Sequence, residues 1–241
     1  MTRGIDPRAV QAAQNNADWY EAMFSVHGLP YERLHHGVLV KADPPPYYSN
    51  LTIAQPNHFD AVKRTWGSIA ARSHGSIVMK DSFCEVEPAK HGFKELFRAQ
   101  WIWRPACRAV LPSGWGTIQS SDDLELWEAC WKEAGSPCDE RVFPAAILDR
   151  KDVQVFGQWD KGRIIAGCIA NLSVDVIGLS NVFALNPSSS GFAHAADAVA
   201  SLDETRPVVG YESGDALDWA SACGFDQVGE LRILIQDAVA Q

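Results

Sequence analysis

The sequence lacks the long hydrophobic run that a membrane span requires. None of its 241 residues lies in an apolar stretch near the roughly 20 residues that cross a bilayer. The N-terminal stretch MTRGIDPRAVQAAQNNADWYEAM has no apolar signal-peptide core. The six cysteines stand singly, without a CxxC pair, which disfavours both a zinc ribbon and a disulfide framework. We therefore expect a cytoplasmic protein with reduced thiols and no membrane partner.

Positive charge is scarce in the second part of the chain. Up to Ser113 there are 13 Lys and Arg residues against 10 Asp and Glu, and after it there are 8 against 20. Such an acidic surface repels nucleic acid and favours cations, so we expect no nucleic-acid partner. The histidines are scattered apart from His35 and His36, whose rings should point to opposite faces of a predicted strand, so no metal site is expected.

Three short stretches of the sequence occur twice. YEAMFSVHGLP, which begins at Tyr20, resembles WEACWKEAGSP, which begins at Trp127. SNLTIAQP (49–56) resembles SNVFALNP (180–187), and HGFKELFRAQWIW (91–103) resembles CGFDQVGELRILI (223–235). Because the matches come in the same order, they indicate two related units. The second unit carries about 24 extra residues, near 138–161.

The hydrophobic pattern predicts one plan of elements for both parts of the chain, with pieces missing from the first part. In the second part, helices over 120–135 and near FPAAIL precede two strands that flank the Asp160-Lys161-Gly162 turn. A strand to Leu185, a helix, a strand VVGYE, a helix and a last strand follow. We predict an α/β (α+β) fold of two tandem units, 1–108 and 109–241, each a mixed, mostly antiparallel sheet flanked by helices.

The segment FALNPSSSGFAHAADAVA (183–200) leads from a strand through a Ser/Gly turn into a helix. This order of elements and this turn resemble the GNAT (general N-acetyltransferase) superfamily, whose turn reads Arg/Gln-x-x-Gly-x-Gly/Ala. Gly191 and Ala193 fit that pattern, whereas Ser188 stands at the Arg/Gln position. The family's tyrosine acid would fall at Ala220. In the first unit the corresponding PNHFDA (56–61) has no glycine, so that unit resembles a degenerate copy.

The resemblance implies that acetyl-CoA binds as co-substrate in the second unit only. Its site would comprise Val182, Phe183, Ala184, Ser188, Ser189, Ser190, Gly191, Phe192 and Ala193. A helix N-terminus attracts phosphate, and glycine permits a close approach of the backbone. The alternative is that Ser188 or Ser190 merely caps the helix.

Glu212, at the end of the strand VVGYE, is the candidate general base, with Tyr211 as its neighbour. The alternative is a solvated carboxylate at a strand end, or a cap shared with Ser213. The leading hypothesis is an N-acetyltransferase that acts on a small-molecule amine, with a homodimer left open as its assembly. The rival hypothesis is a catalytically inactive module that senses CoA or acyl-CoA or serves as an interaction domain.

Overall fold

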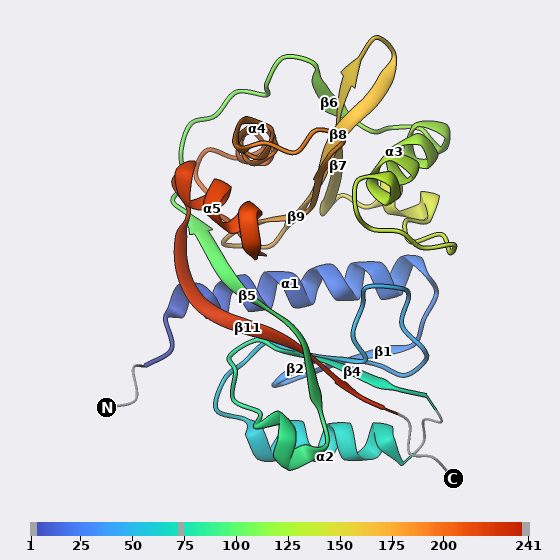
Figure 1. The fold of residues 1–241 in the computed structure, drawn as a ribbon, viewed down its shortest axis with the longest axis vertical. Coiled ribbons are helices and arrows are strands. Elements are labelled where there is room, and N and C mark those ends of the chain that lie inside the picture. The colour runs from blue at the N-terminus through green and yellow to red at the C-terminus, as the bar shows by residue number, and fades with distance from the viewer. Residues whose placement is uncertain (1–3, 72–74, 238–241) are drawn as a thin grey trace. The chain divides into compact units, whose positions relative to one another are not determined.

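The computed structural model describes residues 4–71 and 75–237, and its contacts divide the chain into two compact units (Figure 1). Of these described residues, unit 1 holds those up to 101 and those from 228 to 237, and unit 2 holds residues 102–227. The protein has the predicted fold class, a mixed α/β architecture in which helices flank mostly antiparallel sheet. The described residues contain no helix that is long and apolar enough to cross a membrane.

Unit 1 places helices on the two faces of its strands. Its elements are α1 (Pro7–Val26), β1 (Tyr31–Leu34), β2 (Gly37–Val40), β3 (Leu51–Ile53), α2 (Phe59–Ala70), β4 (Ile77–Asp81), a 3-10 turn η1 (Pro88–His91) and most of β5 (Lys94–Arg104). β3 and β4 run parallel and are joined through α2, whereas β1, β2 and β3 pair antiparallel. Val62, Trp66 and Ile69 of α2 pack on the core beside β3 and β4.

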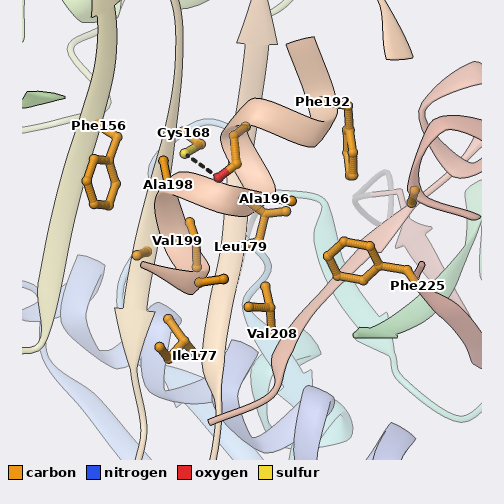
Figure 2. Close-up of a cluster of buried hydrophobic side chains, with 14 of the residues drawn as sticks. Phe156, Cys168, Ile177, Leu179, Phe192, Ala196, Ala198, Val199, Val208 and Phe225 are labelled. Atoms are coloured by element: carbon orange, nitrogen blue, oxygen red, sulfur yellow. Dashed lines mark hydrogen bonds between the residues drawn. The ribbon is translucent and has the colours of Figure 1, made fainter. Parts of the chain in front are cut away.

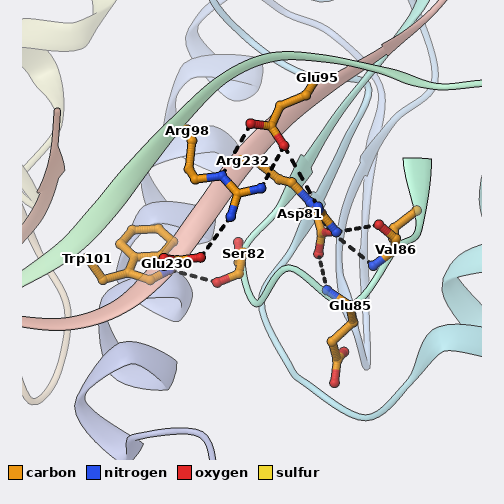
Figure 3. A network of polar contacts seen from close by, with 9 residues as sticks. All are labelled: Asp81, Ser82, Glu85, Val86, Glu95, Arg98, Trp101, Glu230 and Arg232. Carbon is orange, nitrogen blue, oxygen red and sulfur yellow. Dashed lines mark hydrogen bonds and ion pairs between the residues drawn. The ribbon is translucent and has the colours of Figure 1, made fainter. Parts of the chain in front are cut away.

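The last strand, β11 (Asp226–Gln236), pairs antiparallel with β4, from Arg232 opposite Asp81 to Gln236 opposite Ile77. A buried ion pair fixes this strand, because Arg232 Nε lies 3.0 Å from an Asp81 oxygen (Figure 3). The Asp81 carboxylate also accepts the N–H groups of Glu85 and Val86, at 3.1 and 3.0 Å. The contacts thus group residues 228–237 with unit 1, although the sequence repeat assigns them to 109–241, so that boundary stays a prediction.

Unit 2 carries α3 on one side of its strands and α4 on the other (Figure 1). Its elements are β6 (Trp115–Thr117), α3 (Ser121–Glu133), a 3-10 turn η2 (Ala145–Asp149), β7 (Val153–Asp160), β8 (Arg163–Leu172), β9 (Ile177–Ala184), α4 (Ser189–Ala200), β10 (Val208–Glu212) and α5 (Gly214–Ala222). The strands follow the order β10-β9-β8-β7-β6, and only β9 and β10 run parallel among these pairs.

The core of unit 2 lies between α4 and the strands (Figure 2). Cys168 of β8 is fully buried there, and its thiol lies 3.7 Å from the carbonyl oxygen of Ala195 in α4. Phe192 of α4 packs edge-on against Phe225, with ring centroids 6.1 Å apart. This apolar contact fixes the first turn of α4, which contains the predicted phosphate-binding segment.

Two tight turns occupy positions for which the sequence makes a prediction. Lys161 and Gly162 form the predicted two-residue turn between β7 and β8, both with positive φ, as a type I′ hairpin requires. The strand predicted at His35 and His36 is wrong, since both lie in the turn between β1 and β2. His36 is buried and bonds to Thr65, whereas His35 is exposed against His58.

Candidate functional site

The parallel pair β9 and β10 separates before either strand ends. The ladder joins Val208 to Ile177 and Val209 to Gly178, while β9 runs on to Ala184 and β10 to Glu212. At Gly210 the strands are still close, because a Cβ there would lie 2.6 Å from the carbonyl oxygen of Leu179. Beyond that point the edge of β9 that faces β10 has no ladder partner among the described residues. Its backbone groups are therefore free to bond a ligand.

β9 is distorted at the same place. Gly167 of β8 pairs with Phe183 and Ile169 pairs with Ser180, so Asn181 and Val182 together oppose Cys168. Asn181 adopts a positive φ of 52°, which such a β-bulge accommodates. Because the extra residue reverses the alternation of side chains, Val182 and Ala184 pack on the α4 core, whereas Phe183 contacts Trp127 of α3.

The segment that follows β9 begins α4. Ser188 is the N-cap residue, and its hydroxyl accepts the N–H of Gly191 at 3.1 Å. Ser188 therefore caps this helix. A Cβ at Gly191 would meet only the Ser188 hydroxyl among the described residues, at 3.3 Å, so the space in front of this turn is open.

A pocket of about 110 Å³ lies where these features meet. Seven predicted site residues line it: Val182, Phe183 and Ala184 from β9, Ser188, Gly191 and Phe192 from the start of α4, and Glu212 from the end of β10. Ser189, Ser190, Ala193 and Tyr211 were also predicted and are not among its lining residues.

Four further residues line the pocket: Ala134, Pro187, Ala216 and Trp219. Pro187 lies in the strand-proline-helix segment that occurs in both parts of the sequence. Ala134 and Ala216 have no side-chain chemistry that sequence reasoning could have singled out. They reach the pocket because α3 ends and α5 begins beside it. Ala220, at the position of the family's tyrosine, is fully buried.

Glu212 is the one ionisable side chain among the described residues that line this pocket. It is half-buried, and its carboxyl makes no hydrogen bond or ion pair within the described part of the chain. Burial raises its pKa to about 8. Burial and the nearby Glu212 together raise the pKa of Tyr211 to about 12. At pH 7 the Glu212 carboxyl is therefore mostly protonated, and its proton-accepting form increases as the pH approaches 8.

Two ionisable side chains of the neighbouring helices, His194 of α4 and Asp218 of α5, are exposed and do not line the pocket. Ser213 is the N-cap residue of α5 without a side-chain capping bond, so no cap shared with Glu212 forms there. In the described ranges no group of three or more His, Cys, Asp and Glu side chains could hold a metal ion.

No protein-family model and no curated protein matches this sequence. Solved structures do match. A GCN5-related N-acetyltransferase from Kribbella flavida aligns with 95% of this chain and 96% of its own, at a TM-score of 0.60 and 14% identity. A putative acetyltransferase of the GNAT family from Novosphingobium aromaticivorans aligns with 91% of this chain and 97% of its own, at a TM-score of 0.57 and 12% identity.

The fold is that of the GNAT acetyltransferases. An N-myristoyltransferase from Saccharomyces cerevisiae with bound myristoyl-CoA shares it, at a TM-score of 0.52 and 11% identity over 85% of this chain and 60% of the enzyme. The likeness at these identities is one of fold. In this GNAT fold the pocket lies at the divergence of two parallel strands, which is a common location for ligands in α/β sheets.

Proposed function

We propose that unit 2 is an acyl-CoA-dependent N-acyltransferase, which transfers an acetyl group from acetyl-CoA to the amine of a small molecule. The observation that carries this proposal is that one pocket joins the start of α4, the bulged end of β9 and the unpaired carboxyl of Glu212. These are a phosphate-attracting helix terminus, free backbone groups and an acid–base group, which the reaction requires together.

Each part of the pocket has a role in this proposal. The N-terminus of α4 carries a partial positive charge and attracts the pyrophosphate of acetyl-CoA. The free edge of β9 at Val182, Phe183 and Ala184 bonds the amide groups of the pantetheine arm. Since about 110 Å³ is far smaller than a CoA molecule, the pocket takes only the acyl-bearing end and the remainder lies along the surface.

Transfer would proceed by direct attack of the neutral amine nitrogen on the thioester carbon. The C–N bond forms and the C–S bond breaks, which releases CoA as a thiolate. The ionised carboxyl of Glu212 accepts the proton lost by the nitrogen, and the thiolate gains a proton, so charge and atoms balance. With Ala220 in place of the family's tyrosine, the thiolate takes that proton from water or from Glu212 itself.

The acceptor in this proposal is a cationic amine. No Lys or Arg is among the described residues that line the pocket, and the chain after Ser113 is strongly acidic. An ammonium group is attracted to such a surface, and it loses one proton to water before its neutral nitrogen attacks the thioester. The same lack of positive charge weakens the binding of the CoA phosphates, so we expect modest affinity.

A second candidate function is an inactive module that binds CoA or acyl-CoA. Two observations favour it: the Gly191 N–H is already bonded to Ser188, and Ala220 offers no hydroxyl. Both candidates share the ligand and differ in whether the thioester is cleaved.

Thiol release from acetyl-CoA across a panel of amines, from aryl amines to polyamines, separates the two candidates. The enzyme proposal requires amine-dependent thiol release that Glu212→Gln reduces at least about 100-fold, as expected for removal of a positioned general base. Binding of acetyl-CoA without thiol release from any amine would favour the inactive module. The absence of binding at millimolar acetyl-CoA would contradict both.

A further inference from the structure

The pocket is closed on the α3 side by aromatic rings. Phe183 lines it and is 8% exposed, and its ring packs edge-on against Trp127, with ring centroids 5.0 Å apart. Trp127 is fully buried, and its Nε1–H donates to the carbonyl oxygen of Phe156 at 2.8 Å. The indole that supports Phe183 is therefore fixed both by packing and by a hydrogen bond.

A second layer of rings lies behind the first. Phe143 packs edge-on against both Trp127 and Trp131, at centroid distances of 5.2 and 5.1 Å. The backbone around Phe143 is held by the buried carboxylate of Glu128, which accepts the N–H groups of Val142 and Phe143 at 2.7 and 3.2 Å. Since tightly packed interiors yield little, Phe183 cannot move back to enlarge the pocket.

Beneath these rings lies Gly167, the residue of β8 that has no side chain. A Cβ at Gly167 would lie 2.7 Å from Cε1 of Phe183 and 2.3 Å from Nε1 of Trp127. The two rings thus fill the space above a glycine. If Phe183 were smaller, this space would open into the pocket, with only backbone as its floor.

We propose that Phe183 restricts the acyl group to a short chain such as acetyl, and this inference rests on the proposed acyl-CoA site. Three residues of β9 line the pocket. The bulge turns Val182 and Ala184 toward α4, whereas Phe183 contacts α3. The pocket has a volume of about 110 Å³. That space accommodates an acetyl group and excludes a chain as long as the myristoyl group bound by the yeast enzyme of the same fold.

The test is a calorimetric titration of the full chain with acetyl-, butyryl-, hexanoyl- and octanoyl-CoA. In the natural sequence the dissociation constant should increase with chain length. In Phe183→Ala the dissociation constant should instead decrease from acetyl-CoA to hexanoyl-CoA, because each newly buried methylene tightens binding about fourfold. Phe183→Leu should shift the preference toward longer acyl chains by a smaller factor. This variant replaces Phe183→Ala in the test if the alanine variant does not fold.

Phe192→Leu is the matched control. Phe192 lines the same pocket from the α4 side against Phe225, so its loss should change the affinity for all four thioesters by a similar factor. The inference is overturned if the natural protein binds octanoyl-CoA as tightly as acetyl-CoA. It is also overturned if Phe183→Ala and Phe192→Leu give the same chain-length profile. If no thioester binds to any variant, it is the proposed function that fails.

Discussion

Each unit contains a parallel strand pair joined by a helix. The two units differ in the groups that bond the backbone N–H groups at the start of that helix. In unit 1 the N–H of Asn57, just before α2, donates to both oxygens of the Glu85 carboxylate, at 2.9 and 3.0 Å. In unit 2 the neutral hydroxyl of Ser188 caps α4 through the Gly191 N–H. A helix start favours negative charge, and unit 1 supplies that charge from its own chain. In the described part of unit 2 the start of α4 has no carboxylate partner, and in the proposed site the phosphate of acetyl-CoA supplies that charge.

The largest effect should come from placing a carboxylate at the start of α4. Gly191→Glu should weaken acetyl-CoA binding at least about 100-fold, since like charges brought together at an interface cost several kcal/mol. The fold should persist because a Cβ at this position meets only the Ser188 hydroxyl among the described residues. Gly67→Glu is the control, because Gly67 is an exposed glycine of α2 with open space around it. Equal affinities in the two variants, measured by calorimetry, would contradict the assignment of the site.

The carboxyls of the two units should also differ in pH dependence. With an aryl amine as acceptor, whose nitrogen is neutral over this range, the rate of thiol release should rise about tenfold per pH unit toward pH 8, where Glu212 has its pKa, and then level off. Glu212→Gln should remove this dependence, whereas Glu85→Gln should retain it. A profile that keeps its rise in Glu212→Gln would assign the titration to another group.

Glu212 should affect stability with a defined sign as well. Its folded-state pKa is raised above the ordinary value of 4.5, so the protonated carboxyl stabilises the fold fully below about pH 4.5. That contribution is lost as the pH rises toward 8. The stability of Glu212→Gln relative to the natural protein should therefore increase over this interval and stay constant above it. Urea unfolding at a series of pH values measures the difference, and a constant difference would contradict the raised pKa.

Removal of the internal carboxylate of unit 1 should cost less. Glu85→Ala leaves the exposed Asn57 N–H to water, and we expect a loss of about 1 kcal/mol in the free energy of unfolding, the net contribution of one hydrogen bond. Glu87→Ala is the control, because Glu87 pairs with Lys90 on an exposed surface, where such pairs contribute little. Chemical denaturation that finds the two variants equally stable would contradict the role given to Glu85.

The smallest effect is expected at the cap of α4. Ser188→Ala should lower the free energy of unfolding by about 1 kcal/mol, the usual cost of a lost N-cap. Ser188→Asp should keep the cap and the stability, yet it should weaken acetyl-CoA binding, because it gives unit 2 the internal negative charge that unit 1 has. If Ser188→Asp binds acetyl-CoA as tightly as the natural protein does, then the internal negative charge does not explain the difference between the two units.

Local signals in the sequence predicted the parts of the fold that depend on neighbouring residues. The helix predicted over 120–135 is present as α3, with Ser120 as its cap, and the Lys161-Gly162 turn follows from its residue types. β1 was missed because its exposed sequence YERL has no alternating apolar pattern. The pairing of β11 with β4 joins residues about 150 positions apart, which no local pattern encodes. Ala134 reaches the pocket only through the packing of α3, whereas Glu212 could be named because it ends an apolar strand.

The central claim is that one acyl-CoA binds to this chain, in unit 2, and the most direct test is the stoichiometry of acetyl-CoA binding to the full protein by calorimetry. The account predicts one molecule per chain, with an affinity that falls as salt is added because phosphate recognition is electrostatic. Two molecules per chain would show that the Glu85 carboxylate does not prevent acetyl-CoA from binding to unit 1. No binding at millimolar acetyl-CoA would contradict the site itself.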